Sequence, residues 1–166
     1  MISLHDALEA LKSDSVFTNW QKENPDSYLC HCMQMFGDED AWHIGYYNKD
    51  DSITSFAVSS AEVLKENHEE VFKEPDKKVL ALDMNAVELT ATKALDVAKE
   101  FSQKEYPKDV ISKNIIILQN ISEGQVYNVT FVTLSMSTVN VKVNAETGDV
   151  VAHKKTSLMD FKEDVI

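Results

Sequence analysis

The segment of residues 139–154 has the sequence VNVKVNAETGDVVAHK, and it constrains the fold more than any other part of the chain. Val139, Val141 and Val143 alternate with polar residues, which is the period of a strand with one buried face. Gly148 then supplies the positive φ that a hairpin turn commonly requires, and the strand pattern resumes directly after the turn. The chain is therefore predicted to close its second half with a strand, a tight turn and a further strand segment.

Residues 1–59 are predicted to form a first unit in which helical sequence is followed by three strands. Ser3 and Asp6 have the spacing of a capping pair at the start of a short helix. A second cap at residues 13–15 precedes a helix over residues 16–23, which ends before Pro25. Three segments then have the composition of strands joined by polar turns, over residues 28–36, 42–48 and 53–58.

Residues 60–85 form a charged connector. A helix is predicted over residues 61–72, because Val63, Leu64, Val71 and Phe72 form a modest apolar stripe before Pro75 stops it. Residues 79–82 are predicted to form a short edge strand.

Residues 86–166 repeat the order of the first unit. An amphipathic helix running to about residue 105 is predicted from apolar residues at intervals of three and four, and Pro107 ends it. Strands are expected over residues 115–121, 125–135 and 139–143, with a hairpin at residues 122–124. The chain is thus predicted to be an α+β protein of two α-βββ units, each an antiparallel sheet covered by a helix. The shared order suggests a duplication.

Three short motifs in the second unit resemble the PepSY domain. They are Lys93-Ala94-Leu95-Asp96-Val97-Ala98, Tyr127-Asn128-Val129 and Asn144-Ala145-Glu146-Thr147-Gly148-Asp149-Val150. The resemblance covers about residues 86–154, and extending it to the divergent first unit would make the chain a tandem pair. The element order over the whole chain is also similar to that of uncharacterised prokaryotic proteins.

The resemblance implies a small binding or inhibitory module, because PepSY domains are linked with protease propeptides and with secreted or membrane proteins. The sequence shows no export signal and no attached peptidase, which weakens the propeptide role. The family offers no catalytic residues to carry over. The matched positions imply structural roles: Thr147 and Gly148 would form the turn, and Ala94 and Ala98 would allow close packing of the helix on the sheet.

The charge of the chain argues against several classes of partner. The net charge is −12 with a pI near 4.7, so the long-range field repels nucleic acids and anionic lipid surfaces. All 16 basic residues are lysines, which excludes sites that depend on arginine. No segment approaches the roughly 18 consecutive apolar residues of a membrane span, and the N-terminus lacks a basic signal-peptide pattern. We therefore expect a cytoplasmic location and no membrane partner.

Cys30, His31 and Cys32 offer the two chemical alternatives to a binding role. On a strand the two cysteines share one face and could hold zinc or copper, with His43 on a neighbouring strand as the nearest further ligand. A small thiol enzyme could instead use His31 or His43 as the base, with an acid from residues 38–40. His31 is poorly placed for this, since adjacent strand residues point to opposite faces. Buried cysteine is also an ordinary core residue.

The first unit concentrates aromatic residues, which predict either core packing or a peptide groove on the sheet: Trp20, Trp42, Tyr46, Tyr47 and Phe56. We favour a non-catalytic, regulatory protein-binding or peptide-binding module, with a sheet face or an edge strand as the contact surface. No catalytic, metal-binding or cofactor-binding residue is predicted. The partner is expected to be a protein or peptide, and a free sheet face also permits a homodimer.

Overall fold

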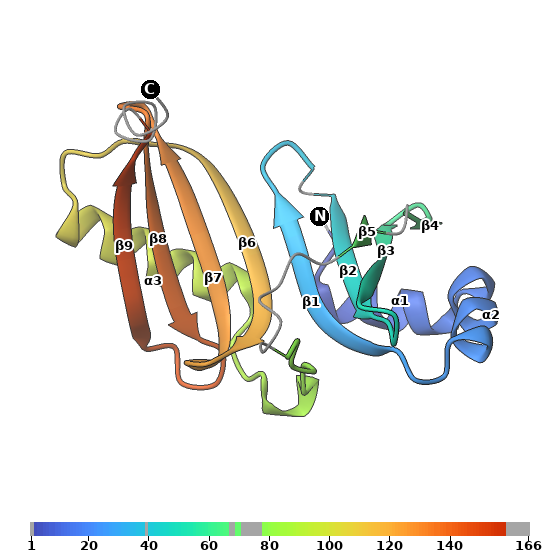
Figure 1. The fold of residues 1–166 in the computed structure, drawn as a ribbon. Helices are drawn as coiled ribbons and strands as arrows, with labels where there is room; N and C mark the ends of the chain where they lie inside the picture. Colours follow the sequence, from blue (N-terminus) through green and yellow to red (C-terminus); the bar gives the residue numbers. More distant parts are fainter. Residues whose placement is uncertain (1, 39, 67–68, 71–77, 159–166) are drawn as a thin grey trace, which may run out of the picture. The chain divides into compact units, whose positions relative to one another are not determined.

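The computed structural model describes residues 2–38, 40–66, 69–70 and 78–158. The chain divides into two compact units, Met1–Asp83 and Met84–Ile166, and each combines helices with antiparallel strands, so the predicted α+β class is confirmed. Figure 1 shows the order of the elements along the chain. The two units are called unit 1 and unit 2.

Unit 1 begins with two helices, α1 (Leu4–Ser13) and α2 (Ser15–Glu23). The side chain of Ser3 accepts a hydrogen bond from the backbone N–H of Asp6, which confirms the predicted cap. Asp14 caps α2 in the same way, with its carboxylate accepting from the backbone N–H of Val16. Each cap satisfies a backbone donor that the first turn of a helix leaves without a partner, and this fixes where each helix starts. The face of α1 that enters the core consists of Leu4, Ala7, Leu8 and Leu11.

The sheet of unit 1 contains the three predicted strands, each within two residues of its expected bounds. They are β1 (Tyr28–Met35), β2 (Ala41–Tyr47) and β3 (Ser52–Ser59), with β2 between the other two. Side chains on one face of the sheet are buried, and α1 contacts β3 on that side. Phe17 and Trp20 of α2 pack against Tyr46 and Phe56, with ring centroids 5.1–5.6 Å apart between the helix and the sheet.

Five aromatic residues of unit 1 are core residues. Those considered for a peptide groove are all at most 9% exposed: Trp20, Trp42, Tyr46, Tyr47 and Phe56. The indole N–H of Trp42 also donates to the backbone carbonyl of Ile2, at 3.2 Å, which ties the N-terminal segment to the sheet. The expectation of core packing is confirmed, and these rings do not form an exposed groove.

The helix predicted over residues 61–72 is wrong where the structure describes this segment. Two short strands, β4 (Val63–Lys65) and β5 (Glu69–Glu70), pair with β3 instead. The side of β3 away from β2 offers a row of backbone donors and acceptors, and pairing with them outweighs a thin apolar stripe. Residues 67–68 and 71–77, which include Val71, Phe72 and Pro75, lie outside the described residues.

The edge strand predicted over residues 79–82 is also wrong, since this segment has no strand geometry. It is held to unit 1 by individual hydrogen bonds. The phenol of Tyr28 donates to the backbone carbonyl of Val79 at 2.5 Å, and the N–H of Leu82 donates to the carbonyl of Leu29 at 2.9 Å.

Unit 2 contains a short 3-10 turn, η1 (Met84–Ala86), one long helix, α3 (Ala91–Glu105), and four strands. The strands run in the order of the chain: β6 (Ile111–Ile121), β7 (Gly124–Thr133), β8 (Ser137–Asn144) and β9 (Val150–Ser157). Thr90 caps α3, so the helix starts later than the apolar pattern suggested, and Val87 precedes it. The last segment is a full strand, which makes this unit α-ββββ rather than α-βββ.

Small residues allow α3 to lie close to the sheet of unit 2, where it contacts β7, β8 and β9 (Figure 1). Ala94 and Ala98 have no exposed surface, as the resemblance implied. Alternate residues of β7 and β8 fill the space beneath the helix: Tyr127, Val129, Phe131, Val139, Val141 and Val143. The opposite face carries polar residues at its centre, where the side-chain amide of Asn140 donates to Asn128 and Thr130.

Candidate functional site

Cys30 and Cys32 lie on the buried face of β1. They are 5% and 0% exposed, and Cys32 pairs with Ile44 of β2. Burial raises the pKa of the Cys30 thiol to about 12 and raises that of Cys32 as well. The Cys30 thiol donates to the backbone carbonyl of Gly45 at 3.4 Å. Both side chains are neutral thiols packed in the core, and this is the opposite of the environment that activates a cysteine.

His43 does not lie near the thiols. It pairs with Met33 on β1 and Ala57 on β3, which places it on the other face of the sheet from Cys32. Its two ring nitrogens contact carboxylates instead: Nε2 lies 2.7 Å from Asp38 Oδ2, and Nδ1 lies 2.7 Å from Glu66 Oε1. The proposed combination of His43 with the cysteines is therefore wrong. Among the residues that the structure describes, no group of three or more His, Cys, Asp or Glu side chains is arranged to hold a metal ion.

His31 is the histidine that does approach a cysteine. Its Nδ1 lies 3.6 Å from Cys30 Sγ, and a β-bulge between Leu29 and His31 brings the two side chains together. The His31 ring packs over Gly45. Because the Cys30 pKa is raised rather than lowered, this contact does not create a thiolate.

The thiols are expected to be unreactive in the folded protein. At pH 8, modification of Cys30 and Cys32 by a disulfide reagent should be more than ~100-fold slower than in denaturant, because so little thiolate is present and the sulfur atoms are covered. Ellman's reagent followed by absorbance measures both rates on one sample. Rapid modification of either cysteine without denaturant would restore the thiol-enzyme alternative.

The turn at residues 144–149 closes one end of unit 2. Gly148 has a φ of +82°, and the side chain of Asn144 accepts from the backbone N–H groups of Glu146 and Thr147, at 2.9 Å each. The buried Ala145 carbonyl accepts from the N–H groups of Glu88 and Leu89. Tyr127, from the second motif, donates through its hydroxyl to the Leu89 carbonyl at 2.7 Å. These motif residues thus join the turn, β7 and the segment before α3, which is a structural role.

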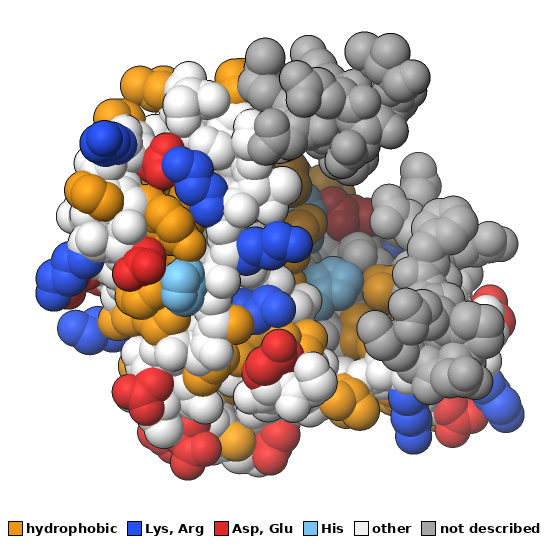
Figure 2. All heavy atoms as spheres, turned by 60° about the vertical axis from the view of Figure 1, so that its left-hand side comes forward, with side chains coloured by type: hydrophobic (Ala, Val, Ile, Leu, Met, Phe, Trp, Pro, Cys, Tyr) orange, Lys and Arg blue, Asp and Glu red, His pale blue; other side chains and the backbone are white. Residues whose placement is uncertain are grey.

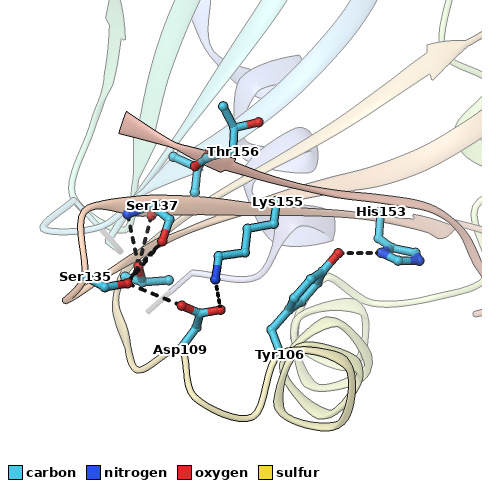
Figure 3. Close-up of polar contacts among 9 residues, drawn as sticks. Tyr106, Asp109, Ser135, Ser137, His153, Lys155 and Thr156 are labelled. Carbon is cyan, nitrogen blue, oxygen red and sulfur yellow. Dashed lines mark hydrogen bonds and ion pairs between the residues drawn. The ribbon is translucent and has the colours of Figure 1, made fainter. Parts of the chain in front are cut away.

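A cluster of polar residues lies at the opposite end of unit 2, where the loop after α3, the β7–β8 turn and the end of β9 meet (Figures 1 and 3). The Asp109 carboxylate binds the Lys155 ammonium at 2.6 Å and accepts from the Ser135 hydroxyl at 3.3 Å. The hydroxyls of Thr133, Ser135 and Ser137 contact one another at 3.0–3.1 Å. We call these five residues the polar cluster.

Tyr106 and His153 form a neighbouring pair between the end of α3 and β9 (Figure 3). The Tyr106 oxygen lies 2.8 Å from Nδ1 of His153, whose ring packs against Phe101 with centroids 4.8 Å apart. Lys155 lies 6.0 Å above the Tyr106 ring, within reach of a cation–π interaction. His153 thus contacts Tyr106, while the exposed Ser135 hydroxyl contacts Asp109 and two other hydroxyls. The serine hydroxyls of the polar cluster thus contact Asp109, Thr133 and one another rather than the His153 ring.

Three exposed apolar residues border the polar cluster. Val110, Leu134 and Met136 are 57%, 69% and 52% exposed, and a hydrogen bond from the Leu134 N–H to the Val110 carbonyl holds the two segments together at 2.9 Å. We call these three residues the apolar tip. In Figure 2, hydrophobic side chains lie at the surface at the top of the view, and lysines and carboxylates are interspersed over the face below them.

Neither the polar cluster nor the apolar tip was predicted. The strand expected over residues 125–135 ran through the end of β7 and hid the turn. A signal was present in the sequence, because residues 134–136 read Leu-Ser-Met between two strands, with apolar side chains where a turn normally has glycine, asparagine or aspartate. The pairing of Asp109 with Lys155 had no local signal, since 46 residues separate them.

Two comparisons with known proteins found a match, one to a family over part of unit 2 and one to a solved structure over most of the chain. Residues 88–154 match the PepSY family, described as "Peptidase propeptide and YPEB domain". The crystal structure of a "putative lipoprotein" from Clostridium difficile 630 is similar, with a TM-score of 0.56 and 14% sequence identity over 88% of this chain and 97% of that chain. This identity supports a shared fold alone. The comparison with curated proteins found no match.

The comparisons give no support to the predicted cytoplasmic location. In the part of the chain that the structure describes, no helix combines the length and the apolar character needed to cross a membrane. A tandem pair also stays a prediction, since the family match stops short of the first unit. The family match places a PepSY domain at residues 88–154, and the buried alanines of α3 and the Asn144–Asp149 turn lie within the matched residues.

Proposed function

We propose that this chain is a non-catalytic module that binds a protein or peptide through the apolar tip of unit 2. One observation carries the proposal: the β7–β8 turn presents Leu134 and Met136 to solvent, and Met136 does so with a φ of +61°. Left-handed backbone is unfavourable for a residue with a long side chain, at roughly 1 kcal/mol or more. A turn serving stability alone would place glycine or asparagine there.

The surroundings of the apolar tip support a binding role. Val110, Leu134 and Met136 form a small apolar centre, while Ser135, Lys155 and the other residues of the polar cluster border it. A protein interface commonly has this composition, with apolar residues in the middle and hydrogen-bonding groups around them. Because Asp109 and the neighbouring hydroxyls hold the turn, its backbone is already ordered before a partner arrives, which reduces the entropy lost on binding.

The class of partner follows from charge and from the family. A net charge of −12 and the absence of arginine argue against nucleic acid. The family description names peptidase propeptides, which makes a peptidase the first class of protein to test as a partner. A second copy of this chain is the other partner that the tip could bind.

Site-specific photocrosslinking tests the proposal. A photoreactive phenylalanine analogue at position 134 should form an adduct with one specific protein in the native host, whereas the same analogue at exposed Glu146, at the other end of unit 2, should not. The double variant L134S/M136N should weaken the captured complex at least ~tenfold in Kd, because the apolar contacts are lost while asparagine tolerates the left-handed backbone. A peptidase or a second copy in the adduct would identify the partner.

The proposal fails if position 134 gives no adduct, or if positions 134 and 146 give the same adducts. It also fails if L134S/M136N binds the captured protein as tightly as the wild type does. Circular dichroism of the double variant should match that of the wild type, which separates a loss of binding from a loss of folding.

A further inference from the structure

His43 on β2 joins two segments that lie far from it in sequence. Its Nε2 contacts Asp38 in the β1–β2 turn, and its Nδ1 contacts Glu66, directly after β4, each at 2.7 Å. The His43 side chain is 16% exposed, while those of Asp38 and Glu66 are 48% and 34% exposed. We call these three residues the His43 clamp. A carboxylate offers only acceptors, so binding one at each ring nitrogen requires a proton on both nitrogens.

We propose that the His43 clamp is a pH-dependent lock that holds the segment of residues 63–66 over the edge of β3. This segment is called the strap. When His43 is protonated, both of its N–H groups donate to carboxylates and the strap is fixed. When His43 loses a proton, one nitrogen becomes an acceptor facing a carboxylate, and the strap is released from the edge.

Apart from the clamp, the strap is held by a short pairing with β3 and by contacts between β4 and α2, and β5 pairs with β3 farther along the same edge. The strap contributes three paired residues, opposite Val58, Ala57 and Phe56, and the Leu64 side chain is 51% exposed. Two backbone bonds fix its ends: the Glu66 N–H donates to the Ser55 carbonyl at 2.7 Å, and the Ser59 N–H donates to the Glu62 carbonyl at 3.0 Å. With so little apolar surface buried, one charge-assisted contact is a large share of its local stability.

The groups around His43 favour its charged form. Burial lowers the pKa of His43, but the hydrogen bonds and the negative charges of Asp38 and Glu66 raise it by more, so the net shift is upward. On this face, Met33 and Ala57 lie directly opposite His43, and the next titratable side chain along β1 is His31. Asp40, before β2, accepts from the Ser60 hydroxyl.

The sign of the pH dependence follows from the upward shift. A histidine whose pKa is higher in the folded state binds its proton more tightly there, so it stabilises the closed strap fully below its ordinary pKa of about 6.5. That stabilisation is lost as the pH rises through the raised value. The strap is therefore closed on the acidic side and opens on the alkaline side, where the β3 edge becomes available for pairing.

Amide hydrogen exchange measured by NMR between pH 5.5 and 9 tests the lock. Protection factors, corrected for the intrinsic exchange rate, are expected to fall about tenfold at the Glu66 and Ser59 amides as His43 titrates, which is the scale expected for losing one charge-assisted hydrogen bond. The side-chain resonances of His43 should titrate above pH 6.5 with the same midpoint. In His43→Gln the protection should no longer depend on pH.

Two further variants keep the result interpretable. Glu66→Gln removes the carboxylate on the strap and should give low protection at every pH, even if His43→Gln fails to fold. His153→Gln, in unit 2, replaces a histidine that contacts a phenol rather than a carboxylate and should leave the strap unchanged. The lock is disproved if wild-type protection at Glu66 and Ser59 is independent of pH, or if it varies equally in His43→Gln.

Discussion

Phe131→Ala is expected to lower the free energy of unfolding of unit 2 by about 3–5 kcal/mol. Phe131 has no exposed surface and lies on the face of β7 that α3 covers, opposite Val139 of β8. Its removal leaves a cavity that neighbouring strands cannot fill without breaking their register. Chemical denaturation followed by circular dichroism measures the change.

Leu134→Ala is the matched control, because the same chain segment carries a second large apolar side chain only three residues away. Leu134 is 69% exposed, so its truncation should change the free energy of unfolding by less than about 0.5 kcal/mol. A loss below about 1 kcal/mol for Phe131→Ala, or equal losses for the two variants, would contradict the placement of these residues.

The local features of the fold could be predicted from the sequence because local contacts determine them. Ser3, Asp14 and Thr90 cap the three helices, and each cap involves residues only two or three positions apart. The alternation in β8 predicts its buried face, and Gly148 marks the turn after it. The PepSY motifs further predict that the helix, the strands and the turn of the second half belong to one domain.

Features that depend on distant partners could not be predicted. Residues 61–72 have a helix-like pattern, but β4 and β5 form because they pair with the edge of β3. No local sequence pattern shows that this edge is available for pairing. The proposed site of Cys32 and His43 required both on one face, whereas the register places Cys32 opposite Ile44 and so puts His43 on the other face. A shift of one position in register is enough to decide such a question.

The two ends of unit 2 differ in structure. At one end the Asn144–Asp149 turn packs on the segment before α3, and the residues that match the family are used to hold it there. At the other end Met136 has an unfavourable backbone conformation and Leu134 is exposed. The proposed function accounts for a residue that is both exposed and unfavourable for stability, because a partner that binds the apolar tip would make use of it.

Gly45→Val is expected to lower the free energy of unfolding by about 3 kcal/mol, although valine favours strands and glycine weakens them. The reason is space. Gly45 lies opposite His31 in the pairing of β1 with β2, and a Cβ at position 45 would overlap the His31 ring, lying 2.7 Å from its Nδ1 atom.

A double-mutant cycle isolates this contact from the intrinsic preferences of the two residues. His31→Ala removes the ring that blocks position 45, so adding it to Gly45→Val should recover at least about 1 kcal/mol of the loss, as expected for residues in direct contact. Denaturation followed by the fluorescence of Trp20 and Trp42, both in unit 1, reports all four proteins of the cycle. Additive effects would mean that the His31 ring does not limit the side chain at position 45, and that Gly45 is required for another reason. A recovery of stability in the double variant would show that the His31 ring of β1 occupies the space a side chain at position 45 of β2 would need.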